Sequence, residues 1–163
     1  MKLHTNTRRA AFSFAVFALA SAGIAHASPR CHRVHYRVTL TASADPTCPS
    51  PIGLCATGEL RGSISGTSDF IGQGFAPIVD PVDPDSTHVA LLTGDNTIHL
   101  RGGDLYTKDA VVLATVGDGE FAEVDTVVGG TGIYAGATGT ITATGVFANG
   151  EGEGTAEGLV CRK

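Results

Sequence analysis

Apolar and polar side chains alternate, one by one, along most of the chain after residue 30. The segment 34–40 reads VHYRVTL, and the segment 140–147 reads TITATGVF. An alternation with a period of two buries one face of a β-strand and leaves the other face in water. No segment after residue 30 has the 3.6-residue period of an amphipathic helix. The sequence therefore predicts an all-β fold.

Turn-forming residues separate the alternating segments. Gly102-Gly103, Gly117-Asp118-Gly119 and Asn149-Gly150 tolerate the positive φ angles that tight hairpins require. Gly94-Asp95-Asn96 has a similar composition, so we expect a turn there too. The strands expected from this pattern are 34–40, 58–68, 87–93, 96–101, 105–116, 120–128, 140–147 and 152–161.

The short connections determine how these strands pair. A parallel crossover needs a dozen or more residues, so neighbouring strands joined by short turns must be antiparallel. Eight or nine antiparallel strands can close into a barrel, which removes the exposed sheet edges. We therefore predict a closed antiparallel eight- or nine-stranded β-barrel, with a two-sheet sandwich as the alternative.

Residues 1–27 have the pattern of an export signal. Lys2, Arg8 and Arg9 are followed by an uncharged apolar stretch and then by Ala25-His26-Ala27, a signal-peptidase type of sequence. The apolar stretch is short for a membrane span, although a retained anchor is the alternative. We expect residues 28–163 to form a single β-barrel domain that is secreted or periplasmic, exported by either the general or the twin-arginine route.

The charge balance limits the partners. Without residues 1–27 the chain has eight Lys and Arg against 16 Asp and Glu, a net charge of −8 with His neutral. Nucleic acids and anionic membrane surfaces would repel such a protein. We therefore expect no nucleic-acid partner and no membrane partner after removal of the signal.

Four cysteines remain after residue 27, which in an exported chain predicts two disulfides. Three pairings are possible, and we favour Cys48–Cys55 and Cys31–Cys161. The first closes a short loop, and the second joins the first strand to the last, as a closed sheet would require. A metal site built on Cys31 and its histidine neighbours is the competing interpretation. It needs reduced thiolates, so we expect no metal.

The sharpest local motif is the run VVGGTGIYAGATG at residues 127–139. Its glycine spacing, GxGxxxG, differs from the GxGxxG of nucleotide-binding folds, and a strand follows where those folds need a helix. The run resembles a motif of dirigent proteins and of the wider group of allene oxide cyclase-like barrels. The hairpin rhythm over most of 56–160 is similar as well. The position before the last glycine, often arginine in dirigent proteins, is Thr138 here.

This resemblance implies a closed antiparallel barrel that is often a homo-oligomer and has an apolar cavity at one end. Plant members of the group steer radical coupling or cyclise an epoxide. Their pocket residues cannot be transferred to this chain one by one. The motif itself has a structural role in the family, with Tyr134 expected to plug against the barrel.

Polar pairs two residues apart on a strand share one face and are the candidate site residues. His99 and Arg101, with Tyr134, are the candidate ligand-binding residues. Glu123 and Asp125 lie on the same face as Phe121 and are a candidate acid–base pair. The alternative for each pair is the wet outer face of the sheet, since unpaired charges are rarely buried.

Two further observations from the sequence say less about function. Asp80, Asp83 and Asp85 could ligate calcium, but a solvated acidic loop is favoured because the glycine and terminal Glu of an EF-hand are missing. No GxSxG nucleophile motif is present, which argues against a hydrolase of that class. We expect no cofactor.

Three functions are compatible with these sequence features. The first is a protein that binds a small apolar molecule in the barrel. The second is an isomerase, a cyclase or a dirigent-type guide of a coupling reaction, and the third is a structural or adhesion module with a solid barrel. A barrel packed solid, with no cavity of about 300 Å³, would eliminate the first two. A charged residue with a shifted pKa inside it would favour the second.

Overall fold

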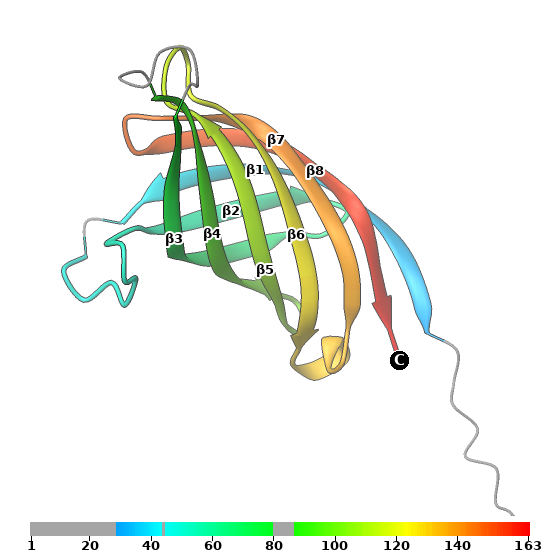
Figure 1. Cartoon of the computed structure of the whole chain (residues 1–163). Coiled ribbons are helices and arrows are strands. Elements are labelled where there is room, and N and C mark those ends of the chain that lie inside the picture. The colour runs from blue at the N-terminus through cyan, green and yellow to red at the C-terminus, as the bar shows by residue number, and fades with distance from the viewer. Residues whose placement is uncertain (1–28, 44, 80–86) are drawn as a thin grey trace, which may run out of the picture.

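The computed structural model describes residues 29–43, 45–79 and 87–163. The expected signal segment 1–27 and the acidic positions Asp80, Asp83 and Asp85 lie outside the described residues. The described part is a closed antiparallel barrel in which each strand pairs with the next (Figure 1). Its eight strands are β1 (Arg30–Ala42), β2 (Cys55–Gly62), β3 (Gly66–Val79), β4 (Thr87–Leu100), β5 (Gly103–Ala114), β6 (Glu120–Gly130), β7 (Thr138–Ala148) and β8 (Glu151–Arg162).

The pairing of the first strand with the last closes the barrel. β1 and β8 pair antiparallel from Arg30 opposite Arg162 to Thr41 opposite Glu151. The blue and red strands in Figure 1 lie side by side along this seam. A disulfide between Cys31 and Cys161 links the same two strands across 130 residues of sequence. The closed barrel and this disulfide pair agree with the expectation from the sequence, and the sandwich alternative is wrong.

The two ends of the barrel differ. At one end, here called the closed end, the glycine-rich run between β6 and β7 forms a short 3₁₀ helix, η1 (Gly132–Tyr134). Tyr134 and Ala137 from this run pack against the core, and the Arg162 guanidinium lies 5.6 Å from the Tyr134 ring centre. The opposite end, at which β1, β3, β5 and β7 finish, is here called the open end.

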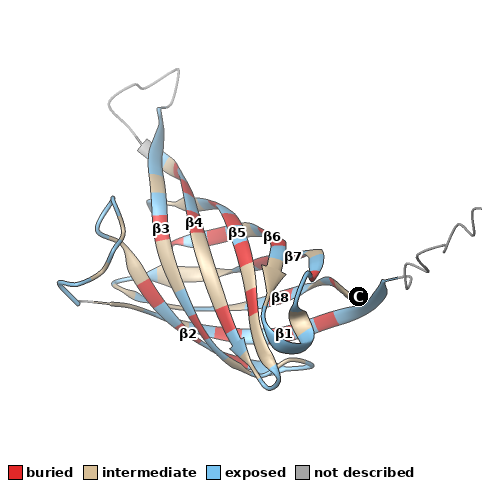
Figure 2. Cartoon of the chain, turned by 90° about the horizontal axis from the view of Figure 1, so that it is seen from below, coloured by how far each residue is buried: buried red, intermediate tan, exposed pale blue. Residues whose placement is uncertain are grey.

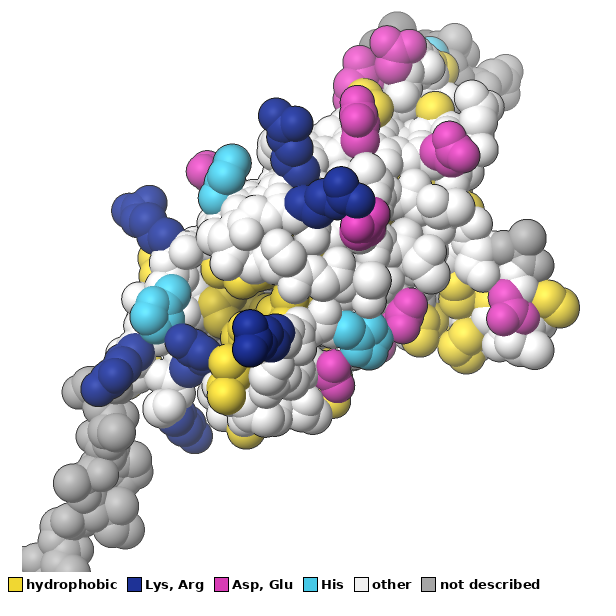
Figure 3. Space-filling view, turned by 180° about the vertical axis from the view of Figure 1, so that it is seen from behind, with side chains coloured by type: hydrophobic (Ala, Val, Ile, Leu, Met, Phe, Trp, Pro, Cys, Tyr) yellow, Lys and Arg dark blue, Asp and Glu magenta, His cyan; other side chains and the backbone are white. Residues whose placement is uncertain are grey.

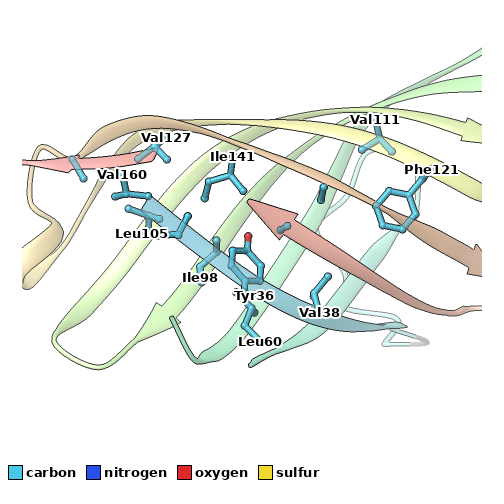
Figure 4. Packing of buried hydrophobic residues seen from close by; sticks show 14 of the residues in the cluster. Tyr36, Val38, Leu60, Ile98, Leu105, Val111, Phe121, Val127, Ile141 and Val160 are labelled. Atoms are coloured by element: carbon cyan, nitrogen blue, oxygen red, sulfur yellow. The ribbon is translucent and has the colours of Figure 1, made fainter. Parts of the chain in front are cut away.

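The core lies inside the barrel because side chains alternate between the two faces of each strand. Buried and exposed residues alternate along the strands in Figure 2. Figure 4 shows Leu105, Val127 and Val160 near the closed end and Val111 and Phe121 toward the open end. The apolar period read from the sequence thus corresponds to the inner face of the barrel.

The expected turn at Gly94-Asp95-Asn96 is wrong, because these residues lie inside the continuous strand β4. Gly94 is required for packing, since a Cβ atom there would lie 2.1 Å from a ring carbon of Phe70. Asp95 points outward and forms an ion pair with Lys108. Residues that favour turns in general are therefore used here for close packing and for surface polarity.

The expected strand 58–68 is also wrong, because the chain turns within it. β2 ends at Gly62 and β3 begins at Gly66, and the hairpin between them is tied to β1. The Ser63 N–H donates to the His35 carbonyl (2.9 Å), and the His35 N–H donates to Ser63 Oγ (2.7 Å). Small residues at 62, 63, 65 and 66 form this turn. The alternation of apolar and polar residues in the sequence runs through the turn and therefore does not mark it.

The second disulfide joins Cys48 to Cys55, as favoured from the sequence, and ties down the loop between β1 and β2. The Ser50 hydroxyl anchors the loop by donating to the Gly72 carbonyl (2.6 Å). Within the described ranges, no helix has the length and apolarity needed to cross a membrane.

The two disulfides should differ in their contribution to stability, because they close loops of different length. Loop-closure entropy assigns about 5 kcal/mol to a loop as long as that of Cys31–Cys161 and about 2 kcal/mol to one as short as that of Cys48–Cys55. We expect the pair Cys31→Ser and Cys161→Ser to lower the free energy of unfolding, measured by urea denaturation, more than the pair Cys48→Ser and Cys55→Ser. A larger loss from the second pair would contradict this.

Candidate functional site

Three carboxyl groups meet inside the barrel, on the neighbouring, hydrogen-bonded strands β5 and β6. Asp109 on β5 lies opposite Asp125 on β6, and Glu123 is two residues away on the same face as Asp125. Asp109 and Asp125 are only 3% and 5% exposed. One oxygen from each of the three lies within 4.8 Å of the others. We call Asp109, Glu123 and Asp125 the acidic cluster.

The alternation of the two strands explains why the cluster points inward. On β6, Phe121 and Val127 are buried core residues, and Glu123 and Asp125 lie between them at the same parity. On β5, Leu105 and Val111 place Asp109 on the inner face in the same way. The candidate acid–base pair from the sequence is therefore brought together in the interior.

Several polar atoms around the cluster are buried without a hydrogen bond. Within the described ranges, no hydrogen bond of standard geometry reaches either carboxylate oxygen of Asp109 or Oδ1 of Asp125. The same holds for Asn96 Oδ1 and Thr107 Oγ1. A buried polar group without a partner costs about 1–3 kcal/mol, more if it is charged. Hydrogen bonds of standard geometry therefore do not satisfy every acceptor of the interior, although Thr107 and Asn96 lie close enough to Asp109 to lower its pKa.

Burial raises the pKa values of all three carboxyl groups. Burial is the main cause for Asp125, whose pKa rises to about 10, and the charges of Glu123 and Asp109 act in the same direction. The pKa of Glu123 rises to about 7, first by burial and then by the charge of Asp109. The pKa of Asp109 rises to about 6, again mainly by burial. At neutral pH the cluster therefore retains protons that exposed carboxyl groups would lose.

Tyr36 from β1 is a further polar group of the interior. Its hydroxyl points into the barrel (Figure 4). The pKa of Tyr36 is raised, first by burial and then by the charges of the cluster, with Asp125 contributing most. The phenol therefore stays neutral over the physiological pH range and can act as a hydrogen-bond donor.

An apolar hollow leads from the open end to the acidic cluster. It has a volume of about 90 Å³ and ends at the polar side chains of Asn96 and Glu123. A cavity of about 30 Å³ beside it is lined by Tyr36, Glu123 and Asp125. The apolar lining of the hollow consists mainly of Leu40, Leu54, Phe70, Leu113, Phe121 and Phe147.

The size of the hollow limits what it can hold. Drug-sized ligands occupy pockets of about 300–1,000 Å³, which neither cavity reaches. The barrel is not packed solid, but the cavity volume expected for a ligand-binding barrel is not met. An engineered cavity of about 150 Å³ lined by apolar side chains binds benzene. At about 90 Å³ the hollow is smaller than that cavity, so it takes only one end of a small molecule.

A larger depression of about 690 Å³ lies on the outer surface of β1, β2, β7 and β8. Its charged lining residues are exposed, and Arg61 donates to its own neighbour Glu59 at 2.7 Å. Figure 3 shows charged side chains scattered over a mostly uncharged surface. The outer depression lacks the buried, unsatisfied polar groups that distinguish the interior.

The structure places His99 and Arg101 outside the barrel, not along its cavity. Both are exposed, whereas their neighbour Ile98 is 2% exposed. His99 Nδ1 lies 2.9 Å from Asp104 Oδ1, and Nε2 lies 3.0 Å from Asp69 Oδ2. The pKa of His99 is raised by these hydrogen bonds, with Asp104 as the larger cause. Since Ile98 and Leu100 form the apolar face of this strand, His99 had to point outward.

Two residues of the interior, Asp109 and Asn96, were not predicted from the sequence. The alternation of β5 could have identified Asp109, because it lies on the same face as the apolar residues Leu105 and Val111. Asn96 was assigned to a turn and so was not considered for an inner face. Tyr134, the third candidate ligand-binding residue, lies at the closed end and away from the hollow.

Comparisons with known proteins give a likeness to solved structures and none in sequence. No protein-family model matches the chain, and no curated protein matches it in sequence. Among solved structures, the chain is similar to a pterocarpan synthase dirigent protein, with 12% identity and a TM-score of 0.49. The alignment covers 85% of this chain and 88% of that one. The assignment as a closed eight-stranded antiparallel barrel rests on the strand pairing of the chain itself.

The raised pKa values predict that the protein loses stability as the pH rises. The folded cluster holds protons that the unfolded chain releases near pH 4, so the free energy of unfolding should fall between about pH 4 and pH 7. Each group contributes at most about 1.4 kcal/mol per pH unit. The pKa values of His99 and Asp125 are also raised, so the free energy of unfolding should continue to fall at higher pH.

The variant Asp125→Asn isolates the part of this pH dependence that is due to the acidic cluster. It removes one titrating group from the interior and should flatten the slope in urea denaturation measured at pH 5, 6, 7 and 8. The exposed Asp118→Asn is the control and should leave the slope unchanged. An Asp125→Asn protein with the wild-type slope would show that the cluster does not hold these protons.

Proposed function

We propose that the barrel binds a small, mainly apolar molecule in the hollow at its open end. The observation that carries this proposal is the meeting of an apolar lining with the polar groups of Glu123 and Asn96 at the inner end of the hollow. Apolar walls supply affinity, and a few convergent polar groups orient a ligand. The volume of about 90 Å³ favours a ligand that inserts a short branched chain or the edge of a single ring.

A second candidate function is acid–base catalysis, as in an isomerase, a cyclase or a guide of a coupling reaction. It is favoured by the pKa of about 7 for Glu123, the member of the acidic cluster that lines the hollow. A group with a pKa near the working pH can both take and return a proton. In this case Glu123 exchanges a proton with the ligand, while Asp125, with its higher pKa, keeps its own proton and donates a hydrogen bond.

The third candidate is a structural module without a ligand. It is favoured by the small volume of the interior cavities, which is well below that of a drug-sized site. A ligand-free barrel would, however, keep the unsatisfied oxygens of the acidic cluster as a cost without a benefit. We therefore rank this candidate below binding.

The proposal includes export to an oxidising compartment. The two disulfides support such a compartment, because thiols are kept reduced in the cytosol. The positively charged start, apolar stretch and small residues of segment 1–27 support removal of a signal. The mature protein then carries a net charge of −8 and remains outside the cytosol.

Filling the hollow tests the proposed binding. Ala56→Leu adds bulk at a residue that lines the hollow, so it should abolish binding of a small apolar fluorescent probe. The matched control is Thr57→Leu, which adds bulk at the next residue, on the outer face of the same strand. Binding is measured by fluorescence titration and folding by melting temperature. Equal binding by both folded variants, or no binding by the wild type, would contradict the proposal.

The export proposal predicts the mass of the protein isolated from its own source. Cleavage after Ala27 and two disulfides should give a chain that begins at Ser28 and lacks four cysteine hydrogens. Intact mass spectrometry measures both. A full-length chain beginning at Met1, or a chain with four free thiols, would overturn the proposal.

A further inference from the structure

We propose that the molecule bound in the hollow carries a protonated amine, which lies against Glu123 and Asp125. This inference rests on the proposed binding function and adds the chemical class of the ligand to it. The predicted ligand is a small organic ammonium ion with an apolar ring or branched chain. Its apolar body fills the hollow, and its ammonium group reaches the acidic cluster.

The first reason is that the interior holds carboxyl groups without cationic partners. None of the Lys and Arg side chains within the described ranges is buried. The alternation of the strands explains this, because Arg37 lies on the outer face between the buried residues Tyr36 and Val38. Lys108 is likewise exposed and pairs with Asp95 outside the barrel. Within the described ranges, a positive charge beside the acidic cluster would therefore come from a bound molecule, in place of one of the protons that the cluster retains.

The second reason is the kind of polar group that remains unsatisfied. Oδ1 of Asp125, which lines the small cavity beside the hollow, is buried and has no hydrogen bond of standard geometry within the described residues. Asn96 Oδ1 is a further unpaired acceptor at the inner end of the hollow. An ammonium group offers three hydrogen-bond donors and no acceptor, which matches a site rich in free acceptors. A ligand that brings another acceptor would leave these oxygens unpaired.

The third reason is the path by which a cation would reach the cluster. The hollow is lined by leucines and by the rings of Phe70, Phe121 and Phe147. A metal ion would have to shed its water along this apolar surface. An organic ammonium ion instead keeps an apolar body against the lining, and its charge is attracted to aromatic faces. The lining therefore favours an amine over a metal ion.

The charge balance of binding gives a measurable consequence. The free cluster retains protons at neutral pH, and a bound ammonium group stabilises an ionised carboxylate beside it. Binding therefore releases up to one proton from the cluster to the solvent, while the amine stays protonated. A neutral ligand of the same shape gives no such release. Proton release thus separates recognition of the charge from burial of the apolar body.

The experiment compares benzylamine with benzyl alcohol, which has nearly the same shape without the charge. Titration calorimetry is carried out on the mature protein at pH 7, in two buffers that differ in their heat of ionisation. We expect benzylamine to bind at least about tenfold more tightly than benzyl alcohol, with release of a fraction of a proton up to one. The difference in apparent heat between the two buffers gives the number of protons released.

Variants locate the interaction. Glu123→Gln should weaken benzylamine binding about tenfold and benzyl alcohol binding much less, because the alcohol carries no charge for the carboxylate to bind. Glu120→Gln, at an exposed position of the same strand, is the matched control and should change neither. If Glu123→Gln does not fold, the affinity ratio and the proton release of the wild-type protein still decide the question.

The outcomes separate this inference from the function on which it rests. Equal affinity for amine and alcohol would overturn the amine proposal while leaving the binding function intact. No binding of either probe, nor of the apolar fluorescent probe, would overturn both. Binding of Ca²⁺ or Mg²⁺ that depends on Glu123, without binding of benzylamine, would show that the cluster is a metal site and would overturn the amine proposal.

Discussion

The hydrogen-bonded seam between β1 and β8 is the contact on which the rest of the structure depends. It turns a curved ribbon of hairpins into a closed wall, and only a closed wall separates the inner face from water. The raised pKa values of the acidic cluster are a consequence, because they are caused mainly by burial. The same carboxyl groups on an open sheet would be solvated. Closure of the fold therefore creates the chemistry of the candidate site.

Small residues on the inner face give the interior its shape. A side chain at Gly94 would collide with the ring of Phe70, and one at Gly154 would lie 3.1 Å from the ring of Phe121. Both rings line the hollow, so the two glycines allow them to lie against the wall. A barrel with larger residues at these positions would have to move the rings toward its axis. The hollow thus depends on residues that do not themselves touch a ligand.

The sequence was sufficient to predict the barrel and both disulfides, because the period of two and the hairpin turns carry most of that information. It could not separate a turn from a strand at Gly94, since glycine serves both turns and close packing. The inner and outer faces could be told apart wherever large apolar residues marked one of them. Glu123 shares its face with Phe121 and points inward, whereas His99 lies opposite Ile98 and Leu100 and points outward. Asp109 shares its face of β5 with Leu105 and Val111, so the alternation marked it as inward, and its register with Asp125 places it in the cluster.

The adjacency of Arg30 and Arg162 has a consequence for how the chain could be rearranged. These residues face each other across the seam, at the same end of the barrel as the Cys31–Cys161 bond. A short peptide could therefore connect them, and new termini could be opened at the exposed turn of Gly117 and Asp118. Such a circular permutant would keep every strand pair while replacing a covalent sulfur link with a backbone link. The order of strands around the barrel is thus independent of the point at which synthesis begins.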